Sequence, residues 1–352
     1  MILMQKVRSA ILYELDHPLK IIELNLPAPE PGEVLVKVLA SGICHTQLLE
    51  IKGENATGPH NPNFLGHEGS GIVVSVGEKV TKVKEGDHVI LSWIRGDGTG
   101  THPKPIEHNG QQINRGSVTT FSDYTVASEN RVTPIRKDMP LMPAALVGCA
   151  VATGMGMVFN NAQVEEESSI MIIGCGGIGI NAIHAASIAK ASTIIAVDRL
   201  EAKLEVAKRF GATHTVNSSK ADLKKELEKL TNQQGLDYAI ETVGKKETME
   251  FVYNSVKKTS GKAILCGVPN PPGQTIEVDP FPLYYGRQLV GTSGGETNPD
   301  IDFDDYCSMY IDGILKLDDM ISHILSLDDI NEGIELMKEG KCIRVLIDMQ
   351  KE

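Results

Sequence analysis

The feature that most constrains the fold is a glycine-rich stretch near the middle of the chain, Ile170–Asp198. An apolar run of strand length, Ile170–Ile173, leads into Gly174, Gly176 and Gly179, which have the spacing G-x-G-x-x-G. A helical pattern follows, and a second apolar run ends at the aspartate that closes the stretch. A strand, a tight turn, a helix and a second strand within about 30 residues are what a dinucleotide-binding βαβ unit requires.

The residue types in this stretch have separate physical roles. The first glycine permits the turn, the second lets backbone approach a pyrophosphate, and the third lets the helix pack closely on the sheet. The N–H groups at the start of the helix, around Gly177 and Ile178, are free to hold phosphates. Asp198 can accept hydrogen bonds from the adenosine ribose hydroxyls and would repel a 2′-phosphate, so we expect NAD. Arg199 beside it keeps NADP as an alternative.

Length, net charge and cysteine usage limit the number of domains, the kinds of binding partner and the cellular location that we expect. A length of 352 residues suggests two domains. A net charge of −12 argues against nucleic acid and anionic membranes as main partners. The six cysteines lie far apart without a C-x-x-C pair, so a disulfide framework is not expected and the default location is cytoplasmic.

The pattern of secondary structure changes along the chain. Residues up to about 150 read as mostly β, with turns marked by proline and glycine. From about 151 to 293, strands alternate with helices, which predicts an α/β domain with a doubly wound parallel sheet. One of these helices carries leucines at positions 223, 227 and 230, and we expect Ser218 or Ser219 to begin it.

Three residues form a candidate metal site: Cys44 in GICHT, His67 in GHEG and Cys149 in LVGCAVATG. Two thiolates and an imidazole suit zinc, and three protein ligands leave a fourth position for water or substrate, as catalytic zinc sites do. The spacing does not establish the site, because the ligands lie far apart in the sequence. Buried free cysteines and a core histidine remain the alternative.

The motifs together resemble a known family. GICHT, GHEGSG, GDHV, LVGCAVATG, GCGGIG and the terminal CIRVLI follow one another as in the zinc-dependent alcohol dehydrogenases of the medium-chain dehydrogenase/reductase family, over nearly the whole chain. The resemblance implies zinc at Cys44, His67 and Cys149. It also implies a GroES-like catalytic domain, 1–150 and 294–352, with a Rossmann domain, 151–293, inserted in it. A homodimer or homotetramer would form through the edge of the Rossmann domain, near Pro282–Gly291.

The same resemblance assigns two residues to the chemistry. Thr46 matches the hydroxyl residue that receives the substrate proton. Glu68 lies behind the zinc in the family pattern, either as an alternate ligand or as a supporting carboxylate. The implied reaction is hydride transfer between a small-molecule alcohol, or its aldehyde or ketone, and NAD(H), with zinc polarising the substrate oxygen.

Further residues match the family's cofactor contacts. Lys203 matches an adenosine-ribose contact, Arg344 a pyrophosphate contact, and Thr153 a residue packed against the nicotinamide. Val243 and Val268 fall where the cofactor passes the strand ends, although small apolar residues are also common in a core.

Three departures from the family pattern carry consequences. The region Trp93–Gly116 has no cysteine, whereas many relatives have four cysteines and a second, structural zinc there, so one zinc per chain is expected. Gln47 replaces an aspartate that orients the ligand histidine, and its side-chain oxygen could still accept that hydrogen bond. Leu49 occupies the place of a relay histidine, so we expect the proton to leave through water rather than through Glu50 or His45.

Two other functions remain open at this point. A zinc-dependent polyol or sugar dehydrogenase has the same architecture, and the polar loop with His102, His108 and Arg115 could face a hydroxylated substrate. A non-catalytic NAD-binding protein would come from a different class, and the intact cysteine and histidine ligands argue against it.

Overall fold

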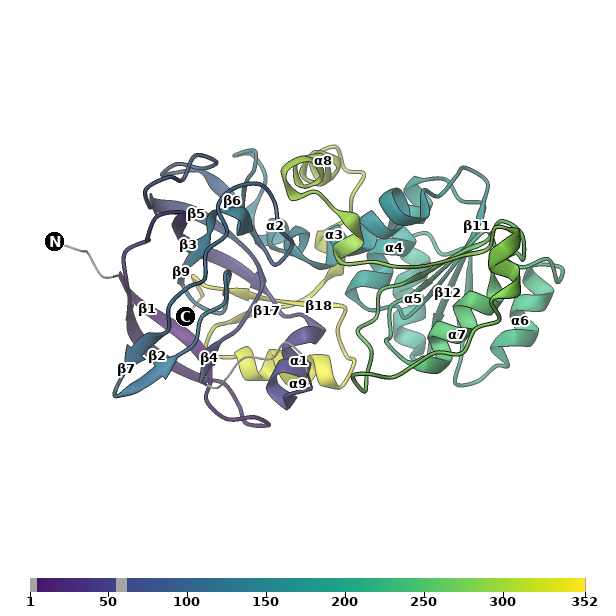
Figure 1. Cartoon of the computed structure of the whole chain (residues 1–352), viewed down its shortest axis with the longest axis horizontal. Coiled ribbons are helices and arrows are strands. Elements are labelled where there is room, and N and C mark those ends of the chain that lie inside the picture. The colour runs from purple at the N-terminus through teal and green to yellow at the C-terminus, as the bar shows by residue number, and fades with distance from the viewer. Residues whose placement is uncertain (1–4, 55–61, 352) are drawn as a thin grey trace. The chain divides into compact units, whose positions relative to one another are not determined.

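The computed structural model describes residues 5–54 and 62–351, which form two compact units. Unit 1 contains the chain up to Cys149 and from Asn298 onward, and unit 2 contains Ala150–Thr297. In Figure 1 the purple and yellow ends of the chain share unit 1, while unit 2 is teal and green. The candidate zinc ligands therefore all belong to unit 1, and the glycine-rich stretch belongs to unit 2.

Unit 1 is built mostly from strands. Its strands are β1 Gln5–Leu12, β2 Lys20–Leu26, β3 Glu33–Gly42, β4 Asn63–Phe64, β5 Glu68–Val76, β6 His88–Ser92, β7 Ile106–His108, β8 Gln111–Ile113, β9 Tyr124–Ser128, β10 Val132–Pro134, β17 Ile321–Ser326 and β18 Arg344–Asp348. Its helices are α1 His45–Lys52, α2 Leu141–Ala144, α8 Pro299–Ile311 and α9 Ile330–Lys338, with short 3-10 helices η1 Glu129–Arg131, η2 Ala145–Gly148 and η6 Asp318–Met320.

The largest sheet of unit 1 joins both ends of the chain. Its strand order is β10-β6-β5-β3-β18-β17, and β9 also pairs with β3. Strand β18 runs antiparallel to β3 and parallel to β17, so the last strand completes a sheet begun by the first third of the chain. The order β2-β1-β4 forms a second sheet, and β7 and β8 form a hairpin.

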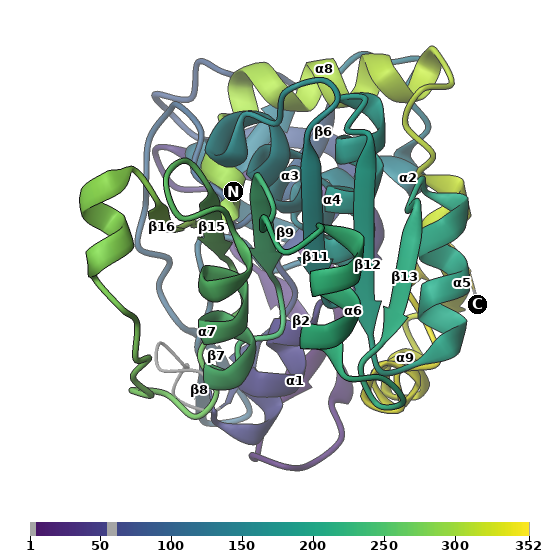
Figure 2. The same ribbon diagram turned by 90° about the vertical axis from the view of Figure 1, so that its right-hand side faces the viewer.

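Unit 2 confirms the predicted doubly wound sheet. Its strands are β11 Ser169–Ile173, β12 Thr193–Asp198, β13 His214–Asn217, β14 Tyr238–Glu241, β15 Lys262–Leu265 and β16 Gln288–Gly291. Its helices are α3 Ala150–Gly156, α4 Gly177–Ile188, α5 Glu201–Arg209, α6 Leu223–Leu230 and α7 Lys246–Ser255, with the π-helix η3 Met157–Ala162 and the 3-10 helices η4 Phe281–Tyr285 and η5 Gly294–Glu296. All neighbours in the order β13-β12-β11-β14-β15-β16 are parallel (Figure 2).

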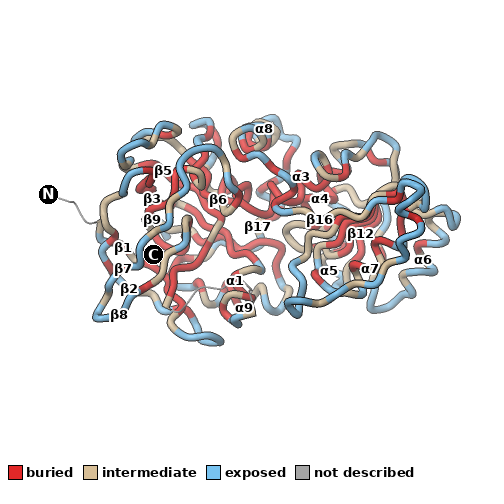
Figure 3. The backbone as a smooth tube through the Cα atoms, in the orientation of Figure 1, coloured by how far each residue is buried: buried red, intermediate tan, exposed pale blue. Residues whose placement is uncertain are grey.

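The apolar runs of unit 2 become its core. Strands β11 and β12 are buried almost throughout (Figure 3). Their side chains pack with those of α6 and α7. This burial on both faces explains why these strands are continuous apolar runs rather than alternating patterns. One boundary differs from the prediction: Asp222, not Ser218 or Ser219, begins α6, because its carboxylate accepts a hydrogen bond from Lys225 N at 3.2 Å.

Within the described ranges no single helix is long and apolar enough to cross a membrane. One pair of consecutive helical segments, Leu141–Gly148 and Ala150–Ala162, passes on combined length and composition, but most of its residues are buried in the protein.

A buried carboxylate anchors the polar loop that has no zinc-binding cysteines. Glu129 is 1% exposed, and its carboxylate accepts hydrogen bonds from the backbone N–H groups of Thr81, Lys82 and Thr99 at 2.6–2.9 Å. Burial alone would raise the pKa of Glu129, but the bonds from these backbone groups outweigh it and hold the pKa below its ordinary value. The same loop continues through the short hairpin β7–β8. A carboxylate therefore organises the backbone of the loop that contains no cysteine.

We expect Glu129→Gln to lower the free energy of unfolding by about 2 kcal/mol near pH 7, because one backbone donor then faces an amide N–H. Since the folded-state pKa is depressed, the stabilisation is present above the ordinary pKa of 4.5 and is lost as pH falls through the folded value. Urea unfolding of the parent and the variant should therefore show that the difference between their free energies of unfolding shrinks as the pH falls from about 7 to 3. Glu85→Gln, at an exposed position, is the control, and a constant difference across this pH range would contradict the account.

Candidate metal centre and dinucleotide site

The structure brings the three predicted metal ligands together. The ligand atoms of Cys44, His67 and Cys149 lie within 4.8 Å of one another, and the two Sγ atoms are 3.8 Å apart. Both cysteines are buried and His67 is half-buried. Among residues 5–54 and 62–351 this is the one group of three or more potential ligands close enough to hold a metal.

Each ligand lies where an element of unit 1 begins or ends. Cys44 follows β3 and is the N-cap residue of α1. His67 immediately precedes β5 and follows Gly66, whose φ of +88° turns the chain between β4 and β5. Cys149 follows η2. Three different segments of chain therefore converge on the site, so its geometry depends on the sheet rather than on a local motif.

The chemistry of these atoms fits zinc. His67 Nε2 is buried and has no hydrogen-bond partner, although an imidazole nitrogen in that setting normally needs one. A metal ion would satisfy that nitrogen and bring two thiolates and one imidazole into a tetrahedral site with an open position. The alternative of a satisfied core histidine is therefore not favoured, because this ring is not satisfied.

Charge at the site is shared between the two thiols. A hydrogen bond from Cys149 lowers the pKa of Cys44, and the same bond raises the pKa of Cys149. Burial lowers the pKa of His67, but the neighbouring Cys44 charge outweighs it and the net shift is upward. The group therefore favours a thiolate at Cys44 and a neutral thiol at Cys149, and that thiol must lose its proton when a cation binds.

Gln47 contacts two of the ligand residues. Its Oε1 accepts a hydrogen bond from Cys44 N at 2.9 Å, and its Nε2 lies 2.7 Å from His67 Nδ1. The side-chain oxygen, which could accept a hydrogen bond from the histidine, therefore bonds to Cys44 N in this structure. In this orientation Nδ1 accepts the bond. A metal on Nε2 would move the ring proton to Nδ1, and Gln47 would then have to turn its amide over.

A buried ion pair lies behind the ligands. Arg344 Nη2 is 3.2 Å from Glu68 Oε2, and both side chains are at most 4% exposed. Arg344 Nη1 also donates to the carbonyl of Ile43, the residue before Cys44. Burial lowers the pKa of Arg344, but Glu68 and the two cysteines outweigh it and the net shift is upward. Glu68 is thus held by Arg344 beside the ligands, and contact of Arg344 with a pyrophosphate stays a prediction.

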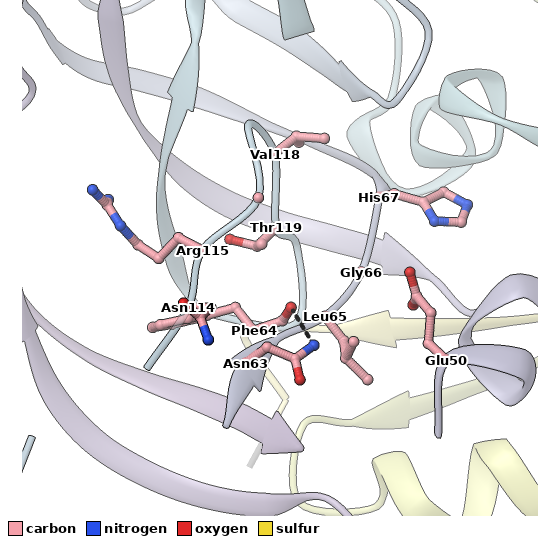
Figure 4. A pocket seen from close by; sticks show the side chains of 11 residues that line it. Glu50, Asn63, Phe64, Leu65, Gly66, His67, Asn114, Arg115, Val118 and Thr119 are labelled. Carbon is pink, nitrogen blue, oxygen red and sulfur yellow. Dashed lines mark hydrogen bonds between the residues drawn. The ribbon is translucent and has the colours of Figure 1, made fainter. Parts of the chain in front are cut away.

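A cavity within unit 1 adjoins one of the metal ligands, His67. It has a volume of about 210 Å³, and His67 and Glu50 form part of its wall (Figure 4). Glu50 accepts a hydrogen bond from Gln47 Nε2 at 3.2 Å, so it belongs to the polar network of the site. The wall is mixed in polarity. Its other members are Asn63, Phe64, Leu65, Gly66, Asn114, Arg115, Gly116, Val118 and Thr119.

Thr46, the predicted proton acceptor, lies next to the ligand Cys44. Thr46 Oγ1 is 3.7 Å from Cys44 Sγ, and its side chain is half-buried. Leu49 is buried, and its side chain has no group that could carry a proton, so the exit of the proton through water stays a prediction. Of the polar loop residues, Arg115 lines the cavity with its guanidinium directed away from His67 in Figure 4, and His102 is exposed.

The glycine motif of unit 2 has the geometry of a phosphate-binding turn. Gly174 has φ +96°, which permits the turn out of β11. A Cβ atom at Gly179 would collide with the carbonyl oxygen of Gly174, so only glycine fits there. A Cβ atom at Gly176 would meet nothing within 4 Å, which leaves open space beside the N-terminus of α4 at Gly177 and Ile178. This arrangement fits a pyrophosphate.

Asp198 connects the end of β12 to this turn. Its Oδ2 accepts a hydrogen bond from Cys175 N at 2.9 Å, and its Oδ1 accepts one from Leu200 N at 2.9 Å. Each carboxylate oxygen can accept a further bond. Asp198 therefore both orders the glycine turn and offers acceptors to a ligand, with exposed Arg199 and half-buried Lys203 nearby in sequence.

The other predicted cofactor residues of unit 2 are accessible or have spare bonding capacity. Val243 is 43% exposed and Val268 is 53% exposed, so neither is a core residue. Thr153 is buried, and its Oγ1 has no hydrogen-bond partner. Sequence reasoning missed Glu241. This buried carboxylate accepts hydrogen bonds from Val243 N and Gly244 N at 2.7 and 2.8 Å and so orders the backbone that follows β14. A charged residue closing an apolar strand was the available signal.

Comparisons with known proteins agree with this geometry. Residues 30–137 match the family model described as alcohol dehydrogenase GroES-like domain, and residues 177–308 match the model described as zinc-binding dehydrogenase. The chain is 36% identical to an alcohol dehydrogenase class-3 of Cereibacter sphaeroides, with 97% of this chain and 99% of the relative covered. It is 35% identical to an S-(hydroxymethyl)glutathione dehydrogenase of Paracoccus denitrificans over the same shares.

Solved structures give the same result. The crystal structure of a benzyl alcohol dehydrogenase of Acinetobacter calcoaceticus has a TM-score of 0.88 to this chain at 28% identity, with 98% of this chain and 99% of that chain covered. A zinc-binding domain protein of Burkholderia ambifaria, described as an alcohol dehydrogenase, has a TM-score of 0.89 at 27% identity and the same coverage.

The geometry predicts one tightly bound zinc per chain, lost when a ligand is removed. Cys149→Ser should reduce zinc content to near zero, because two ligands and a neutral hydroxyl bind zinc poorly. The measurement is elemental analysis of purified protein after dialysis against a weak chelator. Cys307→Ser, which changes a buried cysteine outside the site, should keep its zinc. Two zincs per chain in the parent, or full zinc in Cys149→Ser, would contradict the assignment.

Proposed function

Because the chain belongs to the zinc-dependent alcohol dehydrogenases of the medium-chain dehydrogenase/reductase family, we propose that it oxidises an alcohol with NAD and reduces the matching aldehyde or ketone with NADH. The observation that carries this proposal is the cluster of Cys44, His67 and Cys149 with an unsatisfied His67 nitrogen, in a chain whose second unit has a dinucleotide turn. The relatives' names do not favour a polyol or sugar dehydrogenase.

The residues have defined tasks in this reaction. Cys44, His67 and Cys149 hold zinc, which when bound supplies a Lewis acid that stabilises negative charge on the substrate oxygen. Thr46 accepts the hydroxyl proton of the alcohol and passes it on. The cavity beside His67 receives part of the substrate, and the buried Glu68–Arg344 pair holds the segments that carry the ligands. The turn at Gly174–Gly179 and Asp198 would hold NAD, which would supply the hydride acceptor.

The substrate proposal is an alcohol of small to moderate size with polar groups. The wall of the cavity combines apolar Phe64, Leu65 and Val118 with polar Asn63 and Thr119. Relatives at 34–36% identity include enzymes named for S-(hydroxymethyl)glutathione, so this adduct belongs in a substrate panel with simple primary alcohols. Formation of NADH on that panel by zinc-loaded protein tests the function, and no turnover with any member would contradict it.

The chain also offers a surface for association with a second copy, and we propose a homodimer or homotetramer. Strand β16 is the outermost strand of the order in unit 2, and η4 beside it exposes Phe281, Tyr284 and Tyr285 by 64%, 83% and 58%. An outer strand with exposed aromatic residues favours pairing with an identical strand. Light scattering should give at least twice the chain mass of 38.1 kDa, and a monomer at micromolar concentration would contradict the proposal.

The role of Thr46 predicts a large loss on removal of its hydroxyl. Thr46→Val should lower kcat/KM by about 100-fold or more, which is the usual scale for positioned proton transfer. Thr46→Ser keeps a hydroxyl and is the matched control. Zinc content should be unchanged in both variants, since Thr46 is not a ligand. Activity of Thr46→Val within about threefold of the parent across several pH values would mean that the proton leaves by another path.

The role of Asp198 predicts a change in cofactor preference. The parent should favour NAD, and Asp198→Ala should shift the ratio of kcat/KM for NADP over NAD upward by about tenfold or more, the ratio that about 1.4 kcal/mol gives. The loss of the bond to Cys175 N affects both cofactors alike, so the ratio isolates the effect on the ribose. A parent that prefers NADP would show that the assignment is wrong.

A further inference from the structure

We propose that Trp93 is a positioning residue of the metal centre, whose indole N–H donates a hydrogen bond to the sulfur of the ligand Cys149 and weakens the electron donation of that thiolate. The inference rests on the proposed metal site and adds to it a residue that touches no metal. It concerns the properties of the bound metal rather than the choice of substrate.

The contact itself is direct. Trp93 Nε1 lies 3.3 Å from Cys149 Sγ. An indole nitrogen is only a donor, and a sulfur atom accepts weakly as a thiol but more strongly as a thiolate. Trp93 is the single tryptophan of the chain and is half-buried, so its N–H benefits from a partner inside the protein.

The backbone builds this contact. Ser92, the last residue of β6, pairs with Glu68 at the start of β5, so Trp93 follows β6 where His67 precedes β5. Ser92 Oγ donates a hydrogen bond to the carbonyl of Gly148 at 2.6 Å. The end of β6 therefore positions both Trp93, which follows it, and Gly148, the residue before Cys149.

The indole is also fixed in orientation. The Arg131 guanidinium donates to the backbone carbonyl of Trp93, and Ile94 N donates to Ser92 Oγ at 3.0 Å. The indole meets the His67 ring edge to face, with centroids 6.5 Å apart and an interplanar angle of 71°. Hydrogen bonds thus hold the backbone around Trp93, and the His67 ring packs against the indole whose N–H meets the sulfur.

A hydrogen bond to a ligand sulfur changes the electronic properties of the metal that the sulfur binds. The N–H draws electron density from the thiolate, so the thiolate donates less to the metal and the metal stays a stronger Lewis acid. It also restricts the direction of the Cys149 side chain, as outer partners of metal ligands generally do. Both consequences follow from one N–H group and disappear with it.

The test is the absorption spectrum of the protein loaded with cobalt(II) in place of zinc. Cobalt bound to thiolates gives a sulfur-to-metal charge-transfer band, and a thiolate without its hydrogen bond is a better donor. Trp93→Phe should therefore move this band to longer wavelength and, as the bond also orders the ligand, weaken cobalt affinity by about tenfold. No substrate or cofactor is needed for this readout.

An isostere separates the N–H from the shape of the ring. Because the chain contains one tryptophan, growth of a tryptophan auxotroph on β-(benzothienyl)alanine replaces only Trp93, with sulfur where the N–H was. The proposal expects this protein to show the same shift as Trp93→Phe. If its spectrum and affinity match the parent while Trp93→Phe differs, ring packing is responsible and the proposal is overturned.

The outcomes also separate this inference from the proposed function. A parent protein that gives no sulfur-to-cobalt band lacks the thiolate site, and both the metal assignment and this inference fail. A parent with the band and a Trp93→Phe variant with an identical band and affinity would leave the metal site intact and contradict the role of Trp93 alone.

Discussion

The metal centre depends on a buried ion pair between residues that are 276 positions apart in the chain, Arg344 and Glu68. Arg344 also holds the carbonyl of Ile43, so one guanidinium ties the residue before Cys44 to the residue after His67. Removing either partner would leave a buried charge uncompensated, which typically costs about 3–5 kcal/mol. Because β18 carries Arg344 into the sheet, the site forms only when the end of the chain returns to the first unit.

Cys149, the third ligand, is connected to Glu68 through the pairing of strands β5 and β6. Glu68 lies opposite Ser92, and Ser92 bonds to the carbonyl before Cys149. The backbone of each ligand is thus held through a neighbouring residue. The ligand atoms remain available for a metal, and their positions are set before one binds. Such preorganisation is what a catalytic metal site with an open position needs.

The sequence predicted what depends on local pattern. The glycine spacing, the apolar strands and Asp198 predicted the parallel sheet and its dinucleotide turn, since these obey short-range geometry. The zinc ligands Cys44, His67 and Cys149 became convincing only through resemblance to a family, because their approach depends on the pairing of distant strands. The orientation of the Gln47 amide, the contact of Trp93 with Cys149 and the anchoring role of Glu129 were not predictable. Each is decided by which donor reaches which acceptor in the folded chain, and residue type alone leaves that choice open.

The central claim is that two sulfurs and one nitrogen from unit 1 hold a single zinc that keeps a position open for substrate. Zinc K-edge X-ray absorption on the purified zinc-loaded protein tests it most directly. The account predicts two sulfur neighbours at about 2.3 Å and two nitrogen or oxygen neighbours at about 2.0–2.1 Å, one of them exchangeable. A shell of four sulfurs, or one without sulfur, would contradict it.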